Sequence, residues 1–176
     1  MHPIGGPILA GALAALSCAA AADDLGRITA FLDGESMTWH TITMQQGDKS
    51  VATASFEQGA RLAELYIQGH PEPRFSTRDM FSIEVRYQGT YVPGATPMSV
   101  DVMHIPEGMG GPFWTSRGAT APATIDIVEL DVWGNFGRMT ASFEAELCFR
   151  EIISSATDPS KCRAVTGVIE TELFVE

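Results

Sequence analysis

The stretch Arg138-Met-Thr-Ala-Ser-Phe-Glu-Ala-Glu-Leu-Cys-Phe-Arg150 alternates between apolar and polar side chains along its whole length. Its odd-numbered positions are apolar from Met139 to Phe149, and its even-numbered positions are polar apart from Cys148. Strict alternation of this kind is typical of a β-strand that turns one face to the core and the other to water. We therefore predict a strand over residues 138–150, with Cys148 on its solvent face.

The last segment, Cys162 to Glu176, alternates in the same way and puts Cys162 on its polar side. The residues between the two segments include Ser, Thr, Asp and Pro, which is a loop composition. Two strands joined by this loop would carry one cysteine at each end of the loop, on the same face. We predict a Cys148–Cys162 disulfide that closes a long hairpin. A metal or redox site is disfavoured because the pair has no CxxC spacing and no neighbouring His.

Most of the remaining chain divides into short alternating runs separated by Gly, Pro and Asp. About ten such runs, none with a sustained helical period, predict an all-β fold, either an antiparallel sandwich or a barrel. The most nearly helical segment, Ala60 to Tyr66, is still interpreted as strand. A change of phase after Ile127 indicates a β-bulge. The other predicted strands cover residues 26–32, 37–43, 51–56, 62–68, 81–87, 98–105 and 124–133.

Residues 1–22 contain no Asp, Glu, Lys or Arg and end in four consecutive Ala before Asp23. An uncharged apolar segment closed by small residues is typical of a secretory signal peptide. We predict a cleaved signal over 1–22 and a single β domain over 23–176, periplasmic or secreted, with no membrane span in the mature chain. A retained helix and a lipidated Cys18 are the alternatives.

The charged residues all lie in 23–176, where 22 Asp and Glu outnumber 11 Lys and Arg to give a net charge of −11. Such a charge repels nucleic acid and anionic lipid. It suits a soluble exported domain, and it is compatible with cationic partners. We therefore expect no nucleic-acid partner.

The order of several segments resembles uncharacterised bacterial exported and lipoprotein-like domains of unknown function. In those domains an aromatic-Thr-Ser precedes a strand, a turn and an Arg-x-x-Gly-Thr-Phe strand, although Ala141-Ser142 replaces the Gly-Thr pair here. The resemblance implies a small β-sandwich and carries over no active site. The segments that carry it are Asp33-Gly34-Glu35 with Trp39, then Trp114-Thr-Ser116, Ala123-Thr-Ile-Asp-Ile127 and Gly137-Arg-Met-Thr-Ala-Ser-Phe143.

No Gly-x-Ser-x-Gly elbow, His-Glu-x-x-His motif or phosphate-binding Gly loop occurs in the sequence. The histidines of the predicted domain, His40, His70 and His104, are isolated from one another. We therefore favour a non-enzymatic module without a cofactor, which binds an envelope protein or a glycan, or supports an assembly. The alternative is a copper or calcium protein, or a hydrolase, whose groups converge only in three dimensions.

Three groups of residues are candidate sites. Thioether and imidazole suit copper, which makes Met98, His104 and Met109 candidate ligands. Asp101, Met103 and Glu107 lie close to these ligands in the sequence and could extend the copper site. Strand alternation argues against this larger site, because Met103 would point to the opposite face from Met98 and His104. The carboxylates of Asp126, Glu129 and Asp131 suggest a hard cation more weakly. Phe113 and Trp114 lie in a Gly- and Pro-rich stretch, and binding residues concentrate on such loops.

Overall fold

The computed structural model describes residues 22–176. The regular secondary structure of these residues consists of β-strands, which confirms the predicted all-β class. The predicted signal peptide lies outside the described residues except for Ala22. Nothing in residues 22–176 is a helix long and apolar enough to cross a membrane. The strands are β1 (Asp23–Leu32), β2 (Glu35–Gln46), β3 (Lys49–Ala52), β4 (Ala54–Gln58), β5 (Leu62–Gly69), β6 (Met80–Gln88), β7 (Ser99–Ile105), β8 (Phe113–Thr115), β9 (Thr124–Trp133), β10 (Phe136–Arg150) and β11 (Asp158–Val175).

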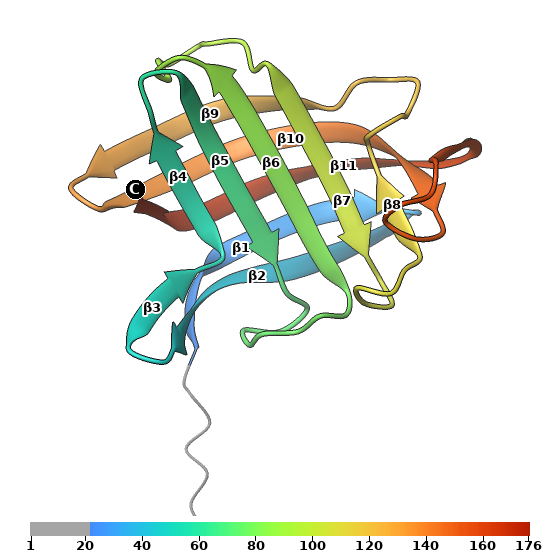
Figure 1. The fold of residues 1–176 in the computed structure, drawn as a ribbon, viewed down its shortest axis with the longest axis horizontal. Coiled ribbons are helices and arrows are strands. Elements are labelled where there is room, and N and C mark those ends of the chain that lie inside the picture. The colour runs from blue at the N-terminus through green and yellow to red at the C-terminus, as the bar shows by residue number, and fades with distance from the viewer. Residues whose placement is uncertain (1–21) are drawn as a thin grey trace, which may run out of the picture.

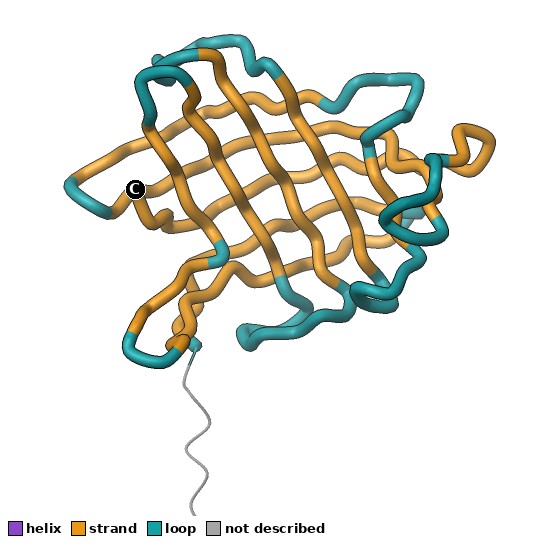
Figure 2. Tube along the Cα trace, in the orientation of Figure 1, coloured by secondary structure: helices purple, strands orange, loops and turns teal. Residues whose placement is uncertain are grey.

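The strands form one hydrogen-bonded sheet that folds over into two layers (Figure 1). The front layer contains β4 to β7, and the back layer contains β2, β1, β11, β10 and β9 in that order. The layers are joined where β4 pairs with the end of β11, where β8 links β7 to β10, and where an isolated bridge connects His40 of β2 to His70, which follows β5. The β11–β4 pairing is parallel, whereas the other pairings between strands are antiparallel. Strands of the two layers cross at a large angle, as in orthogonally packed sheets (Figure 2).

The core fills the space between the layers and is built from the inward positions of each alternating strand. Its aromatic centre joins the layers. Trp39 of β2 stacks on Phe81 of β6 with ring centroids 4.6 Å apart, and Phe81 lies 5.7 Å from Phe143 of β10. The alternation that predicted these strands therefore decides which side chains reach the core.

The predicted disulfide is confirmed. Cys148 and Cys162 are direct partners across β10 and β11, and their Cα atoms are 4.0 Å apart. The prediction that Cys148 faces solvent is wrong, because this residue is fully buried. It shares the outer face with Glu146, but the connection after β8 covers that face, and the Glu146 carboxylate accepts hydrogen bonds from the N–H groups of Thr120 and Ala121.

The predicted bulge is also confirmed. Thr140 pairs with Glu129 and Ala141 pairs with Ile127, so Val128 has no partner across the ladder and is 70% exposed. The strand predicted over 51–56 is divided at Thr53. The Thr53 hydroxyl accepts a hydrogen bond from the Ile42 N–H at 2.8 Å, which ends the pairing with β2 and lets the chain cross to the front layer as β4.

Candidate functional site

A hollow of about 690 Å³ opens between the end of β6 and the beginning of β7 in the front layer and the beginning of β9 in the back layer. We call it the mouth pocket. Its walls come from Tyr87 and Tyr91, from residues 94–100, from Ser116 and from residues 122–127. The volume falls in the range of about 300 to 1,000 Å³ that is usual for small-molecule sites.

The mouth pocket reaches the hydrophobic core. Its wall residues Val100, Ile125 and Ile127 are partly buried and pack against the core cluster. They occupy one side of their strands by alternation, although the bulge after Ile127 moves the following residues of β9 out of the pocket. The pocket is thus continuous with the apolar interior on one side and open to solvent on the other.

Two tyrosines form the aromatic part of the wall. Tyr87 takes the last inward position of β6, and Tyr91 follows the turn at Gly89, so that the rings meet edge to face with centroids 4.8 Å apart. Burial raises the pKa of Tyr87 to about 12, and burial also raises the pKa of Tyr91. Both side chains therefore stay neutral at physiological pH, and each hydroxyl can donate or accept a hydrogen bond.

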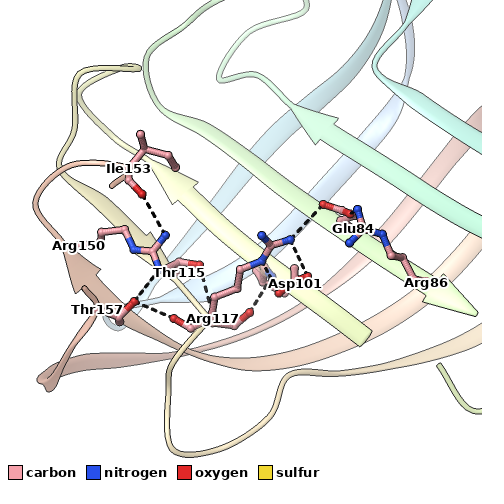
Figure 3. A network of polar contacts seen from close by, with 10 residues as sticks. Glu84, Arg86, Asp101, Thr115, Arg117, Arg150, Ile153 and Thr157 are labelled. Atoms are coloured by element: carbon pink, nitrogen blue, oxygen red, sulfur yellow. Dashed lines mark hydrogen bonds and ion pairs between the residues drawn. The ribbon is translucent and has the colours of Figure 1, made fainter. Parts of the chain in front are cut away.

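An ion-pair network holds the connection that carries Ser116 and residues 122 and 123 of the wall (Figure 3). The Arg117 guanidinium lies 2.8 Å from the Asp101 carboxylate and 3.5 Å from that of Glu84. The Arg117 carbonyl accepts a hydrogen bond from the Thr157 hydroxyl, which itself accepts one from Arg150. The wall is thereby fixed to both layers at the point where it leaves β8.

A second group of polar residues, the interlayer polar cluster, lies at the other end of the layers and consists of Asp33, Trp39, Asp79, His104 and Arg163, of which Asp33 is exposed. Arg163 donates to Nδ1 of His104 at 2.6 Å and to Asp33 at 2.7 Å. Since Nδ1 accepts, the imidazole proton is assigned to Nε2, which donates to Asp79 at 2.7 Å. Asp79 also accepts from the indole N–H of Trp39 at 3.3 Å.

The interlayer polar cluster connects the two layers, and both ring nitrogens of His104 have partners within it. His104 is 4% exposed. The hydrogen bond from His104 is the main cause that lowers the pKa of Asp79. Asp33 and Asp79 are the two non-glycine residues between 22 and 176 with positive φ, 53° and 49°, a backbone conformation that tertiary contacts must hold. The geometry thus fits a structural role rather than acid–base chemistry.

His70 is fully buried in the segment that leads into Asp79. Its Nδ1 contacts the Ser76 carbonyl at 2.9 Å, and its Nε2 has no hydrogen-bond partner among residues 22–176. Burial lowers the pKa of His70. The unfolded chain therefore binds a proton at His70 more readily than the folded one, and its contribution to stability is lost as the pH falls below about 6.5.

We therefore predict that lowering the pH from about 7.5 to about 5.5 destabilises the protein and that His70→Asn weakens this dependence. Asn keeps a donor for the Ser76 carbonyl but does not titrate. Urea denaturation at the two pH values measures the effect. Asp79 does not contribute to the change between pH 7.5 and 5.5, because its pKa is lowered from an ordinary value of 3.8 and its carboxylate stays ionised in this range. Equal pH slopes for the two proteins would contradict this assignment.

The structure separates the three candidate copper ligands. Met98 is exposed at the mouth pocket, whereas Met109 is exposed at a different hollow beside Phe75. His104 lies at the far end of β7 from Met98, about 20 Å away along an extended strand. The geometry therefore brings no pair of these three residues together. Within residues 22–176, the one grouping with metal-ligand spacing is Glu146 with the two cysteines, whose sulfurs are bonded to each other.

The predicted hard-cation residues also divide. Glu129 and Asp131 lie 3.6 Å and 3.7 Å from the Arg138 guanidinium, while Asp126 lines the mouth pocket. Of the wider cluster, Met103 packs in a small satellite core and Asp101 binds Arg117.

The two predicted binding residues lie in a strand rather than in a loop. Phe113 and Trp114 belong to β8, and Phe113 is 1% exposed. Trp114 packs between Phe149 and the Arg163 guanidinium, which lies 4.1 Å from its ring. The pocket is instead walled by the connections before and after this region. Tyr91 was missed, although the Gly- and Pro-rich composition of residues 89–97 is the same signal that selected Phe113 and Trp114.

No family model, no curated protein and no solved structure matches this chain.

Proposed function

We propose that this protein is a non-enzymatic binding module that takes a small, partly apolar ligand into the mouth pocket. The single observation that carries the proposal is a hollow of about 690 Å³ that reaches the core and has a wall in which aliphatic and aromatic side chains alternate with Ser, Thr and Tyr hydroxyls. Concave sites of this size and composition are where proteins bind small molecules.

The absence of catalytic motifs from the sequence supports the non-enzymatic part of the proposal. None of the described histidines lines the mouth pocket. His104 and His40 each contact a carboxylate, of Asp79 and Asp24 respectively, but both pairs lie outside the pocket. The proposal includes export to the periplasm or beyond, which rests on the uncharged residues 1–22 and is consistent with a disulfide, since disulfides persist in oxidising compartments.

Filling the pocket should abolish binding. We expect Ile127→Trp, which places an indole in the wall, to weaken binding of the neutral fluorescent probe N-phenyl-1-naphthylamine by more than about tenfold. The matched control is Val128→Trp, because the neighbouring residue on β9 is exposed and lies outside the pocket. Fluorescence titration gives the dissociation constants, and circular dichroism checks that each variant folds.

Thr96→Trp provides a second way to block the pocket, from an exposed loop position of the wall where a larger side chain does not enter the core. Both blocking variants should lose the probe while Val128→Trp retains it. The proposal is wrong if the unmodified protein does not bind the probe, or if both folded blocking variants bind it as well as the control does.

A further inference from the structure

We propose that the free edge of β9 binds an extended segment of a partner protein in which Lys or Arg alternates with apolar residues. The segment would add one strand to the back layer, as in β-augmentation. This interaction is separate from the proposed pocket function, because it involves a protein partner and the backbone of an edge strand. Three features of β9 support it, namely its unpaired edge, the apolar side chains beside that edge and the charges on its outward face.

β9 is the outermost strand of the back layer (Figure 1), and among residues 22–176 β10 is the one strand that pairs with it. Edge strands are often protected from further pairing by Lys, by Pro or by being short. β9 is ten residues long and contains no Lys or Pro. Its backbone is therefore open to a further strand, most of all in the regular stretch that follows the bulge at Val128.

The turn after β9 shows which backbone groups point to the free edge. A two-residue turn joins β9 to β10, so that Trp133 and Phe136 flank it as a pair. The pair beside such a turn exchanges hydrogen bonds, and bonded and non-bonded pairs alternate along an antiparallel ladder. Leu130 and Val132 lie at the non-bonded positions, so their N–H and C=O groups point away from β10. None of the backbone hydrogen bonds outside the strand ladders of residues 22–176 involves these groups.

The inward side chains of β9 leave apolar surface beside the free edge. Ile127 and Leu130 are partly buried against the core, and Val132 is 47% exposed. The apolar interior thus ends at β9 without a further strand to cover it. An added strand would turn every second side chain to this side, where apolar side chains would bury the surface.

The outward face of β9 favours cations at the other positions of the partner strand. Asp126, Glu129 and Asp131 occupy this face, and all three are exposed. Arg138 of β10 lies 3.6 Å from Glu129 and 3.7 Å from Asp131, so one guanidinium is shared between two carboxylates. Opposite charges on directly facing residues of neighbouring strands stabilise their pairing. The exposed ring of Trp133 also offers a face to a partner cation at the end of the strand.

A second copy of the chain fits this edge poorly. If two β9 strands paired antiparallel along their whole length, with Val128 unpaired in both, Asp126 would lie opposite Asp131 and Glu129 opposite its own copy. Like charges that face each other directly across two strands are destabilising. The acidic face thus opposes self-association, and together with the net charge of −11 it attracts a basic partner.

A synthetic peptide of four Lys-Val repeats tests the proposal, and a peptide of four Glu-Val repeats is its charge-reversed counterpart. We expect the Lys-Val peptide to bind at least about tenfold more tightly, as measured by isothermal titration calorimetry. Amide hydrogen exchange followed by NMR locates the contact. The peptide should slow exchange of the Leu130 and Val132 N–H groups by at least about tenfold. Exchange at Asp131, whose N–H already faces β10, should change little.

Val132→Pro tests whether the peptide pairs with the backbone. Proline removes the N–H that points to the free edge, and it is tolerated on an edge strand because the ladder on the other side is kept. This variant should bind the Lys-Val peptide at least about tenfold more weakly. Val132→Ala is the matched control, since it shortens the same side chain but keeps the N–H, and it should lose less than about threefold. Circular dichroism checks that each variant folds.

The double variant Glu129→Gln/Asp131→Asn tests the charges and should weaken binding of the Lys-Val peptide by about tenfold. Its control is Glu35→Gln/Asp48→Asn, which removes two exposed carboxylates at the start of β2 and in the turn after it. The control should change the affinity by less than about twofold.

Each of four results would overturn the proposal. The first is that the Lys-Val peptide does not bind, or binds no more tightly than the Glu-Val peptide. The second is that Val132→Pro, once folded, binds it as tightly as Val132→Ala. Equal losses in the two double variants would assign the binding to net charge. Slow exchange at Leu130 and Val132 in the free protein, together with a dimer in analytical ultracentrifugation, would show that a second copy occupies the edge.

Discussion

Replacing Trp39 by Ala should lower the free energy of unfolding by about 4 kcal/mol. The side chain is fully buried, stacks on Phe81 and meets the His104 ring edge to face. Removing it leaves a cavity between the layers and takes away the N–H that donates to Asp79. Urea denaturation followed by circular dichroism measures the loss.

Two further substitutions resolve this loss into its parts. Trp39→Phe keeps an aromatic ring but loses the donor to Asp79, so it should cost about 1 to 2 kcal/mol. Trp133→Ala, at a position that is 53% exposed, should change stability by less than about 0.5 kcal/mol. If Trp39→Ala cost no more than Trp133→Ala, the position of Trp39 at the centre of the core would be wrong.

Arg163→Met should destabilise the protein by about 3 kcal/mol. Methionine can still lie over the Trp114 ring, so the substitution mainly removes the charge and the donors. Nδ1 of His104 would then be a buried acceptor without a partner, and the carboxylate of Asp33 would lose its cation. The loss should appear as a lower urea midpoint with an unchanged slope.

Arg138→Met is the comparison for Arg163. The Arg138 side chain is 56% exposed and lies 3.6 Å or more from its acidic neighbours, so its removal should cost less than about 0.5 kcal/mol. The double variant Arg163→Met/His104→Leu should cost less than the sum of the two single variants, because the residues share one contact. Additive losses would show that they act independently.

Local alternation predicted most of the fold because each strand has one face in the core. The pattern of residues 138–150 contains enough information to place Phe143 inside, and the change of phase after Ile127 located the bulge at Val128. The disulfide followed from two such patterns taken together. What alternation does not contain is the way loops cover an outer face, which is why Cys148 is buried on the side predicted to be wet.

The interlayer polar cluster and the mouth pocket could not be predicted from the sequence, because they depend on contacts between distant parts of the chain. His104 meets Arg163, which lies 59 residues further along, and Asp79, which lies 25 residues before it. No local spacing marks such a group. The mouth pocket likewise joins Tyr87 to Asp126 from different layers. Loop composition selected Phe113 and Trp114, but the structure places both in β8, where Phe113 is buried and Trp114 is partly buried against Phe149.

The position of β11 has a consequence for how the chain acquires its structure. β11 lies between β1 and β10 in the back layer and also pairs with β4, yet it is the last strand in the sequence. A chain that emerges N-terminus first can form the β1–β2 and β9–β10 hairpins early, but these halves have no common neighbour until residues 158–175 arrive. Pairings over such long separations form slowly, and unpaired strand edges are prone to aggregate. Until β11 docks, the facing edges of β1 and β10 have no partner strand, so we expect the chain to be most prone to aggregation during that interval.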